Sequence, residues 1–310
     1  MIKRTLYIEN PAYLSVSLSQ LKIKFPEVEK NIPKDFSDRF TNSIPIEDIG
    51  VVILDNPQIT ITQKALQALN ENNCAVIICD NQRMPYGLLL PLTNNTLQGE
   101  RYRYQINSST PLKKQLWQQT IQSKILNQAT LLKEINNSQI SNMTKWAKEV
   151  KSGDSTNLEA RAAVYYWSNI FPNINSFIRD RYGEPPNNLL NYGYSILRSI
   201  IARALVGTGL LPTIGIHHRN KYNAYALADD IMEPYRPFVD SVVVKIINSG
   251  IDYSTLNRDI KIQLMSIPIL DVSINNLKRP LQIAASITTS SLLKCFTKED
   301  NRISYPKMKL

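Results

Sequence analysis

The sequence predicts an α+β protein: a small N-terminal β-rich domain, residues 1–95, followed by a larger all-α domain, residues 96–310. Two patterns predict this class, because short β-branched runs fall in the first part of the chain and long helical stripes fall in the second. The length of 310 residues also suits two domains, since a typical domain takes about 100–200 residues.

The first domain is assigned from short apolar runs. These runs alternate or are rich in β-branched residues, and we expect strands at residues 5–8, 14–18, 21–24, 49–54 and 75–79. Thr62 is placed to cap a short helix, which Asn72 and Asn73 end. The domain ends near Pro91, after which a segment rich in tyrosine and arginine leads on.

The second domain is assigned from apolar residues at helical spacing. A first helix starts just before Pro111, which suits a first turn, and it runs to Asn136. The pattern predicts further helices over residues 154–167, 188–205, 226–247 and 281–293. Pro234 and Pro237 predict a kink in the fourth helix, because proline removes a backbone donor.

Composition excludes several classes of protein. No apolar run reaches the ~18–20 residues of a membrane span, and the N-terminus lacks the apolar stretch of a signal peptide. The three cysteines include no CxxC pair, so they predict neither a disulfide framework nor a zinc cage. We therefore expect a protein of the reducing cytoplasm that has no membrane partner.

Charge divides the chain unequally. Residues 1–95 carry nine basic and ten acidic side chains, whereas residues 96–310 carry 27 basic and 16 acidic ones. Basic residues are densest over residues 101–151 and again over residues 278–310. This excess predicts a surface that binds a polyanion such as nucleic acid, and the alternative is that the lysines only solubilise a helical surface.

Glu159 is the first candidate for metal binding. It lies within a predicted helix, and the neighbours one turn on, Ala162 and Ala163, are small enough to leave room around its carboxylate. The alternative is a surface glutamate that pairs with Arg161 or Lys151.

His217 and His218 are the second candidates, and they are the only histidines in the protein. They fall in a loop between two predicted helices. Adjacent side chains do not point at one target on a regular element, so at most one of the two is expected to be a ligand. A polar surface histidine is the alternative.

Asp230 and Glu233 are the third candidates, at the start of the fourth predicted helix. Their i, i+3 spacing puts both carboxylates on one helix face. Acidic residues in a first turn also stabilise the helix dipole, which would explain them without any metal.

Together these residues offer two or three carboxylates and one imidazole. Such a mixed oxygen and nitrogen set suits Mg²⁺ or Mn²⁺ better than zinc, which favours thiolates. An ion of this kind can bind a phosphodiester oxygen and stabilise charge in phosphoryl transfer. A non-haem iron site needs two histidines and a carboxylate, a geometry that adjacent histidines supply poorly.

Several runs resemble a known family: NLLNYGYSIL at 188–197, GLLP at 209–212, GIHH at 215–218 and DIMEPYRP at 230–237. Their order and spacing closely resemble those of the CRISPR adaptation integrase, the universal metal-dependent subunit that inserts new spacers. NNCAVIICD at 72–80 and PYG at 85–87 look like the N-terminal β domain of that family. The sequence of residues 217–237 is most similar to that of the branch of the family from type II systems.

The resemblance implies roles for the candidate residues. It assigns Glu159, His218 and Glu233 as ligands of Mg²⁺ or Mn²⁺, and it makes Asp230 a further catalytic position that supports the site or a water. His217 is expected to form a hydrogen bond or contact DNA.

The resemblance also implies a reaction and partners. The 3′-hydroxyl of a captured prespacer duplex would attack a phosphodiester at the border of the CRISPR leader and repeat, with DNA endonuclease activity beside this joining. Homodimers would be bridged by a small ferredoxin-like adaptation subunit, and the type II RNA-guided effector nuclease would assist. The β-rich domain would serve dimerisation and partner contacts, and the helical domain catalysis and DNA binding.

Two other functions stay open on the residues alone. One is a metal-dependent nuclease of DNA or RNA without integration, and the other is a non-catalytic DNA-binding scaffold. Basic residues would contact phosphates in each case. Tyr102, Tyr104, Trp117 and Trp146 could stack on splayed DNA ends, although for Trp117 a core position is favoured.

Overall fold

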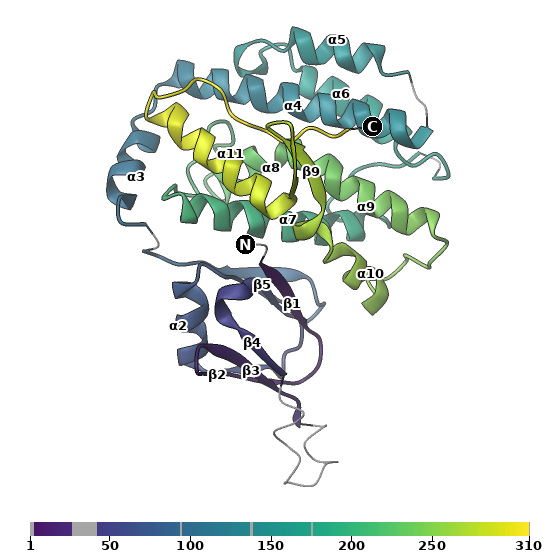
Figure 1. Cartoon of the computed structure of the whole chain (residues 1–310). Coiled ribbons are helices and arrows are strands. Elements are labelled where there is room, and N and C mark those ends of the chain that lie inside the picture. The colour runs from purple at the N-terminus through teal and green to yellow at the C-terminus, as the bar shows by residue number, and fades with distance from the viewer. Residues whose placement is uncertain (1–2, 27–41, 94, 137–138, 175, 310) are drawn as a thin grey trace. The chain divides into compact units, whose positions relative to one another are not determined.

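The computed structural model describes residues 3–26, 42–93, 95–136, 139–174 and 176–309. It divides into two compact units, residues 1–94 and residues 95–310 (Figure 1). β-Sheets form the first unit and helices dominate the second, so the predicted fold class is confirmed. Among the described residues, no helix is both long enough and apolar enough to cross a membrane.

Two four-stranded sheets build the first unit. One sheet has parallel neighbours except at its last strand, in the order β1 (Arg4–Ile8), β5 (Ile49–Leu54), β7 (Ala75–Cys79) and β8 (Pro85–Leu89). The other has the order β4 (Asn42–Pro45), β3 (Gln20–Lys24), β2 (Tyr13–Ser17) and β6 (Thr60–Ile61). A 3₁₀ turn, η2 (Ile46–Asp48), precedes β5.

A single described helix, α2 (Gln63–Glu71), connects β6 to β7 within this unit. The Thr62 hydroxyl accepts the backbone N–H of Ala65, as the capping pattern predicts. Asn73 adopts a left-handed φ of 52° directly after the helix, the conformation that commonly ends one. Apolar side chains from both sheets and from α2 form one continuous core, which includes Leu14, Leu21, Ile49, Val52 and Leu69.

The second unit is a helical assembly with one β-hairpin. Its helices are α3 (Gln98–Ile106), α4 (Thr110–Asn136), α5 (Ser141–Glu149), α6 (Leu158–Asn169), α7 (Asn187–Gly207), α8 (Ala226–Met232), α9 (Arg236–Asn248), α10 (Arg258–Leu264) and α11 (Leu281–Phe296). Short 3₁₀ turns add η3 (Ser152–Asp154), η4 (Glu233–Tyr235) and η5 (Ile267–Ile269), and the hairpin is β9 (Asp271–Ile274) with β10 (Leu277–Pro280).

All five predicted helices are present, and η4 forms the kink expected between α8 and α9. The predicted second helix begins later than expected, at Leu158, because residues 152–154 form η3. Helices α3, α5 and α10 and the β9–β10 hairpin are additions to the predicted set. Each is short, and α5 for example buries only Met143 and Ala147, so its apolar stripe is too brief to recognise from spacing.

Helix α4 is the element around which the site is built. It crosses the helical unit and packs against α5, α6 and η4, as Figure 1 shows for α5 and α6. Trp117, Ile121, Lys124 and Gln128 are all buried on it, at the spacing of one helix face. A lysine on such a face must find negative partners, because an unpaired buried charge is costly.

Candidate active site

Two carboxylates from different elements meet at one buried lysine. Glu159 lies in the first turn of α6, and Glu233 begins η4. The Lys124 Nζ atom lies 2.6 Å from Glu159 Oε1 and 2.6 Å from Glu233 Oε2. We call these three residues the carboxylate–lysine cluster. The structure therefore brings together two of the carboxylates that the sequence singled out, although 74 positions of chain separate them.

Glu159 is held by the capping of α6. Both oxygens of Asp154 accept backbone N–H groups from the helix start, one from Leu158 and one from Glu159, each at 2.9 Å. The partner of Glu159 is Lys124, and neither surface alternative is realised, since Arg161 lies over the ring of Trp146 instead. This pairing shows why a solvated surface glutamate is the wrong description.

Glu233 is almost fully enclosed, with 7% of its side chain exposed. Burial by itself raises the pKa of this carboxyl, but the charges of Arg236, Lys124 and His218 outweigh burial and lower the pKa from 4.5 to about 2. Arg236 Nε donates to Glu233 Oε1 at 2.8 Å. Glu233 is therefore ionised throughout the physiological pH range.

Lys124 stays charged for a matching reason. Burial lowers its pKa, yet the charges of Glu233 and Glu159 and the hydrogen bonds to them raise the pKa above the ordinary lysine value. Lys124 belongs to the segment 101–151, whose basic residues are predicted to contact phosphates, and its burial excludes it from that surface. The signal that could have found it is its place on the buried stripe, seven residues after Trp117.

Asp230 organises the histidine loop from a fully buried position in α8. Its carboxylate accepts the backbone N–H groups of Ile216, His217 and His218 at 2.7, 3.0 and 3.1 Å. Its Oδ1 atom also lies 2.5 Å from His218 Nδ1. Gly215 permits the loop to pass this close to Asp230, because a Cβ atom at position 215 would lie 2.7 Å from Asp230 Oδ2.

The loop orients the two histidines differently. The hydrogen bond to Asp230 raises the pKa of His218, with burial acting against it. The ring of His217 stacks on Trp117 with centroids 4.0 Å apart and planes 2° from parallel, and burial lowers its pKa. Trp117 is 1% exposed and so is a core residue, as favoured from the sequence.

Another buried carboxylate, that of Asp240 in α9, was not found from the sequence. It accepts hydrogen bonds from the hydroxyl groups of Tyr166 at 2.7 Å and Tyr194 at 2.5 Å. Burial raises its pKa to about 6, although both tyrosines and the nearby Arg236 and Arg179 act in the opposite direction. The sequence signal that could have identified Asp240 is its position among the apolar residues of α9.

A small cavity of about 150 Å³ opens beside the carboxylate–lysine cluster. Lys124, Glu233 and Asp240 line it, together with Ala163, one of the two alanines expected to leave room near Glu159. Ala162, the other, is buried. Lys124 and Glu233 of the cluster are thus accessible from one side through a space of modest size.

The arrangement fits a divalent cation in part. Within the described residues, no three side chains of His, Cys, Asp or Glu are gathered as a metal site, and His218 bonds to Asp230 and not to the glutamates. However, Glu159 and Glu233 already converge on one cation, the Lys124 ammonium. Because Asp230 engages Nδ1 of His218, the Nε2 atom is left to serve as a ligand, the usual arrangement of metal-binding histidines.

Comparison with known proteins identifies the family. The model of CRISPR associated protein Cas1 matches residues 6–259. The CRISPR-associated endonuclease Cas1 of Neisseria meningitidis serogroup C (strain 8013) is 36% identical over 266 residues, which cover 86% of this chain and 83% of that protein.

Two solved structures share the fold. A casposase bound to integration product has a TM-score of 0.75 at 20% identity and covers 97% of this chain and 92% of its own. A Cas6-RT-Cas1–Cas2 complex has a TM-score of 0.75 at 21% identity and covers 100% of this chain but 36% of its own. With the family match extending over most of the chain and a relative of this identity aligned along it, the protein belongs to the Cas1 family of CRISPR-associated proteins.

Proposed function

We propose that this protein is a metal-dependent DNA integrase of CRISPR adaptation, with an associated DNA endonuclease activity. In the reaction, the 3′-hydroxyl of a prespacer attacks a phosphodiester at the border of the leader and repeat, and the strand is joined by transesterification. The observation that carries the proposal is the convergence of Glu159 and Glu233 on one cation beside the Asp230-anchored His218. A relative named as an endonuclease and a structural neighbour bound to its integration product support the same class of chemistry.

Glu159, His218 and Glu233 would hold the metal ion, with Mg²⁺ or Mn²⁺ favoured by the carboxylate and imidazole donors. When bound, the ion supplies charge neutralisation at the phosphodiester and activation of the attacking oxygen. Asp230 takes a different role in this proposal. Both of its oxygens already accept hydrogen bonds from the loop, so it positions His218 and binds no metal itself.

The remaining groups of the site prepare a place for a phosphodiester. Arg236 holds the Glu233 carboxylate in one orientation, and the cavity beside the cluster limits the water around it. Holding both DNA molecules on one protein could lower the barrier by about 7–11 kcal/mol through effective molarity. Two joining events are required, so two active subunits must be held at a fixed spacing.

The partners follow from that requirement. We infer a homodimer, bridged by a small ferredoxin-like adaptation subunit, in which the N-terminal β unit makes the dimer and partner contacts. A structural neighbour that contains Cas1 and Cas2 supports an assembly of this type. Assistance from the type II RNA-guided effector nuclease and a cytoplasmic location remain predictions from the sequence.

DNA itself is proposed to lie on the basic surface of the helical unit, with prespacer and leader–repeat duplexes as its substrates. Apart from the buried Lys124, the lysines of residues 101–151 are available for phosphates, and Lys114, Lys133 and Lys148 are exposed. Tyr104 is 42% exposed and can offer a stacking surface.

A strand-joining assay tests the proposal. It combines a labelled short duplex with a free 3′-hydroxyl, a supercoiled plasmid carrying a leader and repeat, the small partner, and Mg²⁺ or Mn²⁺. Wild type is compared with Glu159→Gln and His218→Ala, and Glu149→Gln is the matched control because that glutamate is exposed and lies 3.9 Å from Lys145. We expect covalent joining with wild type and the control, and none with the site variants or with a chelator.

Each other outcome selects an alternative. Plasmid or duplex cleavage without joining would indicate a nuclease that uses water at the same residues. Binding of DNA that neither variant nor chelator affects, with no chemistry, would indicate a scaffold. Joining by Glu159→Gln at the wild-type rate would contradict the assignment of the site.

A further inference from the structure

Asp240 is the point at which three helices of the helical unit meet through hydrogen bonds. It lies in α9 and is 1% exposed. The Tyr166 hydroxyl of α6 donates to its Oδ2 atom at 2.7 Å, and the Tyr194 hydroxyl of α7 donates to its Oδ1 atom at 2.5 Å. We call these three residues the tyrosine–aspartate triad. One carboxylate thus joins α6, α7 and α9, with a hydrogen bond at each of its oxygens.

The first connection from the triad leads to Glu159. Tyr166 follows Glu159 by seven residues in α6, which is close to two helical turns, so both residues lie on one face of the helix. Asp154 holds the start of α6 through two backbone N–H groups. The hydrogen bond between Tyr166 and Asp240 holds the helix two turns further on, and together these contacts fix the helix that carries Glu159.

The second connection leads to Glu233 through an arginine. The Cζ atom of Arg236 lies over the ring of Tyr194, 4.5 Å from the ring centroid. Arg179 lies over the same ring at 5.4 Å. An aromatic face attracts a cation at such distances, so the ring helps to hold the Arg236 guanidinium in place. That guanidinium in turn donates to Glu233 Oε1 at 2.8 Å.

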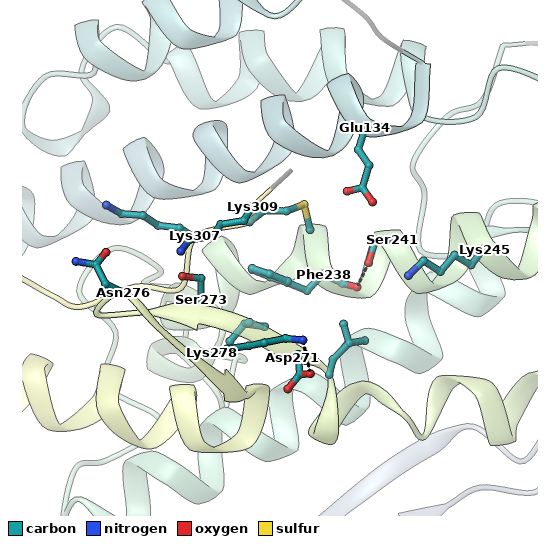
Figure 2. Close-up of a pocket in the computed structure, with 13 residues that line it drawn as sticks. Glu134, Phe238, Ser241, Lys245, Asp271, Ser273, Asn276, Lys278, Lys307 and Lys309 are labelled. Carbon is teal, nitrogen blue, oxygen red and sulfur yellow. Dashed lines mark hydrogen bonds and ion pairs between the residues drawn. The ribbon is translucent and has the colours of Figure 1, made fainter.

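The triad belongs to the side of α9 that carries the site. Asp240 and Tyr194 line the cavity of about 150 Å³ beside the carboxylate–lysine cluster. A larger cavity of about 400 Å³ lies between α9, the β9–β10 hairpin, the end of α4 and the C-terminal segment (Figure 2). Figure 2 shows Phe238, Ser241 and Lys245 of α9 around this larger cavity, and its described lining residues include no member of the triad.

The Lys124 ammonium holds the two glutamates of the carboxylate–lysine cluster together in the metal-free protein. In the proposed reaction this ammonium must give way to a divalent ion, so it cannot set the spacing of the glutamates during strand joining. The triad is connected to them only through α6 and Arg236, and it can therefore keep its hydrogen bonds when a metal binds.

From these observations we infer that Asp240 is a positioning residue for metal binding and strand joining. It acts through the two tyrosines of the triad and sets the spacing at which the two glutamates of the cluster converge on a divalent ion. The inference rests on the proposed function, because it needs the metal ion that these glutamates are proposed to hold.

Calorimetric titration of Mn²⁺ into the full-length protein provides the test. Asp240→Ala removes the acceptor, whereas Asp240→Asn keeps a polar contact to both hydroxyl groups, since an amide both accepts and donates. Tyr194→Phe removes one hydroxyl and keeps the ring beside Arg236. The control is Ile246→Val, which trims a buried apolar side chain of the same helix and removes no side-chain hydrogen bond.

Asp240→Ala should weaken Mn²⁺ binding by about 10-fold, the lower end of the effect of removing a group that orients metal ligands. Tyr194→Phe should give part of that loss, and Asp240→Asn should recover most of the affinity. Combining Asp240→Ala with Tyr194→Phe should weaken binding no further than Asp240→Ala alone, because both changes break the same connection. Ile246→Val should bind Mn²⁺ as wild type does.

Thermal unfolding distinguishes positioning from a loss of stability alone. If Asp240→Ala unfolds at a lower temperature but binds Mn²⁺ with wild-type affinity, the triad only stabilises the fold and the inference is overturned. An equal loss of affinity in Ile246→Val, or additive losses in the double variant, would overturn it as well. If Asp240→Ala does not fold, Tyr194→Phe decides, and wild-type affinity in that variant overturns the inference.

The strand-joining assay on the same proteins separates this inference from the proposed function. If wild type joins strands and the variants keep their Mn²⁺ affinity, only the role of Asp240 is wrong. If wild type binds Mn²⁺ but joins nothing, and Asp240→Ala loses affinity, the integrase activity is wrong while Asp240 still positions the metal ligands. If wild type binds no Mn²⁺, the metal site and this inference are both wrong.

Discussion

Lysine serves two opposite purposes in the helical unit. Lys124 is buried in the carboxylate–lysine cluster between two carboxylates, whereas Lys245, Lys307 and Lys309 are exposed around a cavity and have no acidic partner among the described residues. A buried charge acts strongly on its neighbours because little water screens it, and an exposed charge acts weakly but remains free for a ligand. The environment of a lysine, rather than its residue type, therefore decides whether it organises a site or stays free for a ligand.

This difference predicts a hierarchy of effects. Changes in the carboxylate–lysine cluster should alter both folding stability and activity, since each group there relies on the others. Changes to exposed lysines such as Lys245 and Lys307 should leave stability nearly unchanged. Four perturbations test the buried side of the comparison.

The largest effect is expected for Glu233→Gln. The variant leaves the buried Lys124 and the partly exposed Arg236 with one carboxylate fewer, and breaking a buried ion pair costs about 3–5 kcal/mol of unfolding free energy. Strand joining should fall at least 100-fold. Urea unfolding and the joining assay measure both. The control Glu149→Gln breaks an exposed pair and should change stability by less than about 0.5 kcal/mol; a similar loss in both variants would erase the distinction between buried and exposed pairs.

Asp230→Ala should rank second. It leaves three backbone N–H groups and His218 Nδ1 without their acceptor, and each unmet buried donor costs about 1–3 kcal/mol unless water enters. Activity should fall by about 10–100-fold, the usual effect of removing a group that orients a metal ligand. Calorimetric titration of Mn²⁺ gives an independent measure, and unchanged Mn²⁺ affinity would contradict a positioning role for Asp230.

Lys124→Met should separate the roles of the lysine and a divalent ion. The variant removes the cation that now neutralises Glu159 and Glu233, so the metal-free protein should unfold at a lower temperature. Mn²⁺ should then raise the unfolding temperature of the variant more than that of wild type, because it no longer competes with the ammonium group. Thermal unfolding with and without MnCl₂ measures this, using Lys145→Met as the exposed control. Equal Mn²⁺ shifts in all three would mean that ion and lysine occupy different places.

The smallest expected effect concerns pH and Asp240. Its pKa of about 6 in the folded protein lies above the ordinary 3.8, so the folded state binds the proton more tightly. This carboxyl therefore lowers the free energy of unfolding as the pH rises from about 4 to about 6. Asp240→Asn should remove that contribution while keeping a polar partner for Tyr166 and Tyr194.

Denaturant unfolding at about pH 4 and pH 7 checks this prediction through the difference between wild type and variant. The control is the exposed Asp252, whose pKa is lowered by hydrogen bonds from Ser254. For Asp252→Asn, the difference in unfolding free energy between wild type and variant should change with pH in the opposite direction. If the difference in unfolding free energy between wild type and Asp240→Asn does not change with pH, Asp240 keeps one protonation state.

Much of the fold could be predicted from local patterns. Strands β1, β2, β3, β5 and β7 of the first unit, the Thr62 cap and the long helices follow from apolar spacing and capping residues, which act over a few neighbouring positions. The described strands β4, β6 and β8 of that unit were not predicted. The short helices α3, α5 and α10 were missed, because tertiary packing rather than local pattern stabilises an element of seven to nine residues. The hairpin of β9 and β10 was missed for the same reason.

The candidate site divides in a similar way. The sequence by itself determined which acidic residues and histidines are candidates for the site. Glu159, His218, Asp230 and Glu233 stand in recognisable runs of sequence. Only the tertiary structure decided their partners: it placed Lys124 of α4 between two carboxylates and directed Asp230 to the histidine loop. It also brought α9, the β9–β10 hairpin and the C-terminal segment together around one cavity. The physical reason is that a charge responds to whatever lies within a few ångströms of it, and in this chain those neighbours come from segments far apart in sequence.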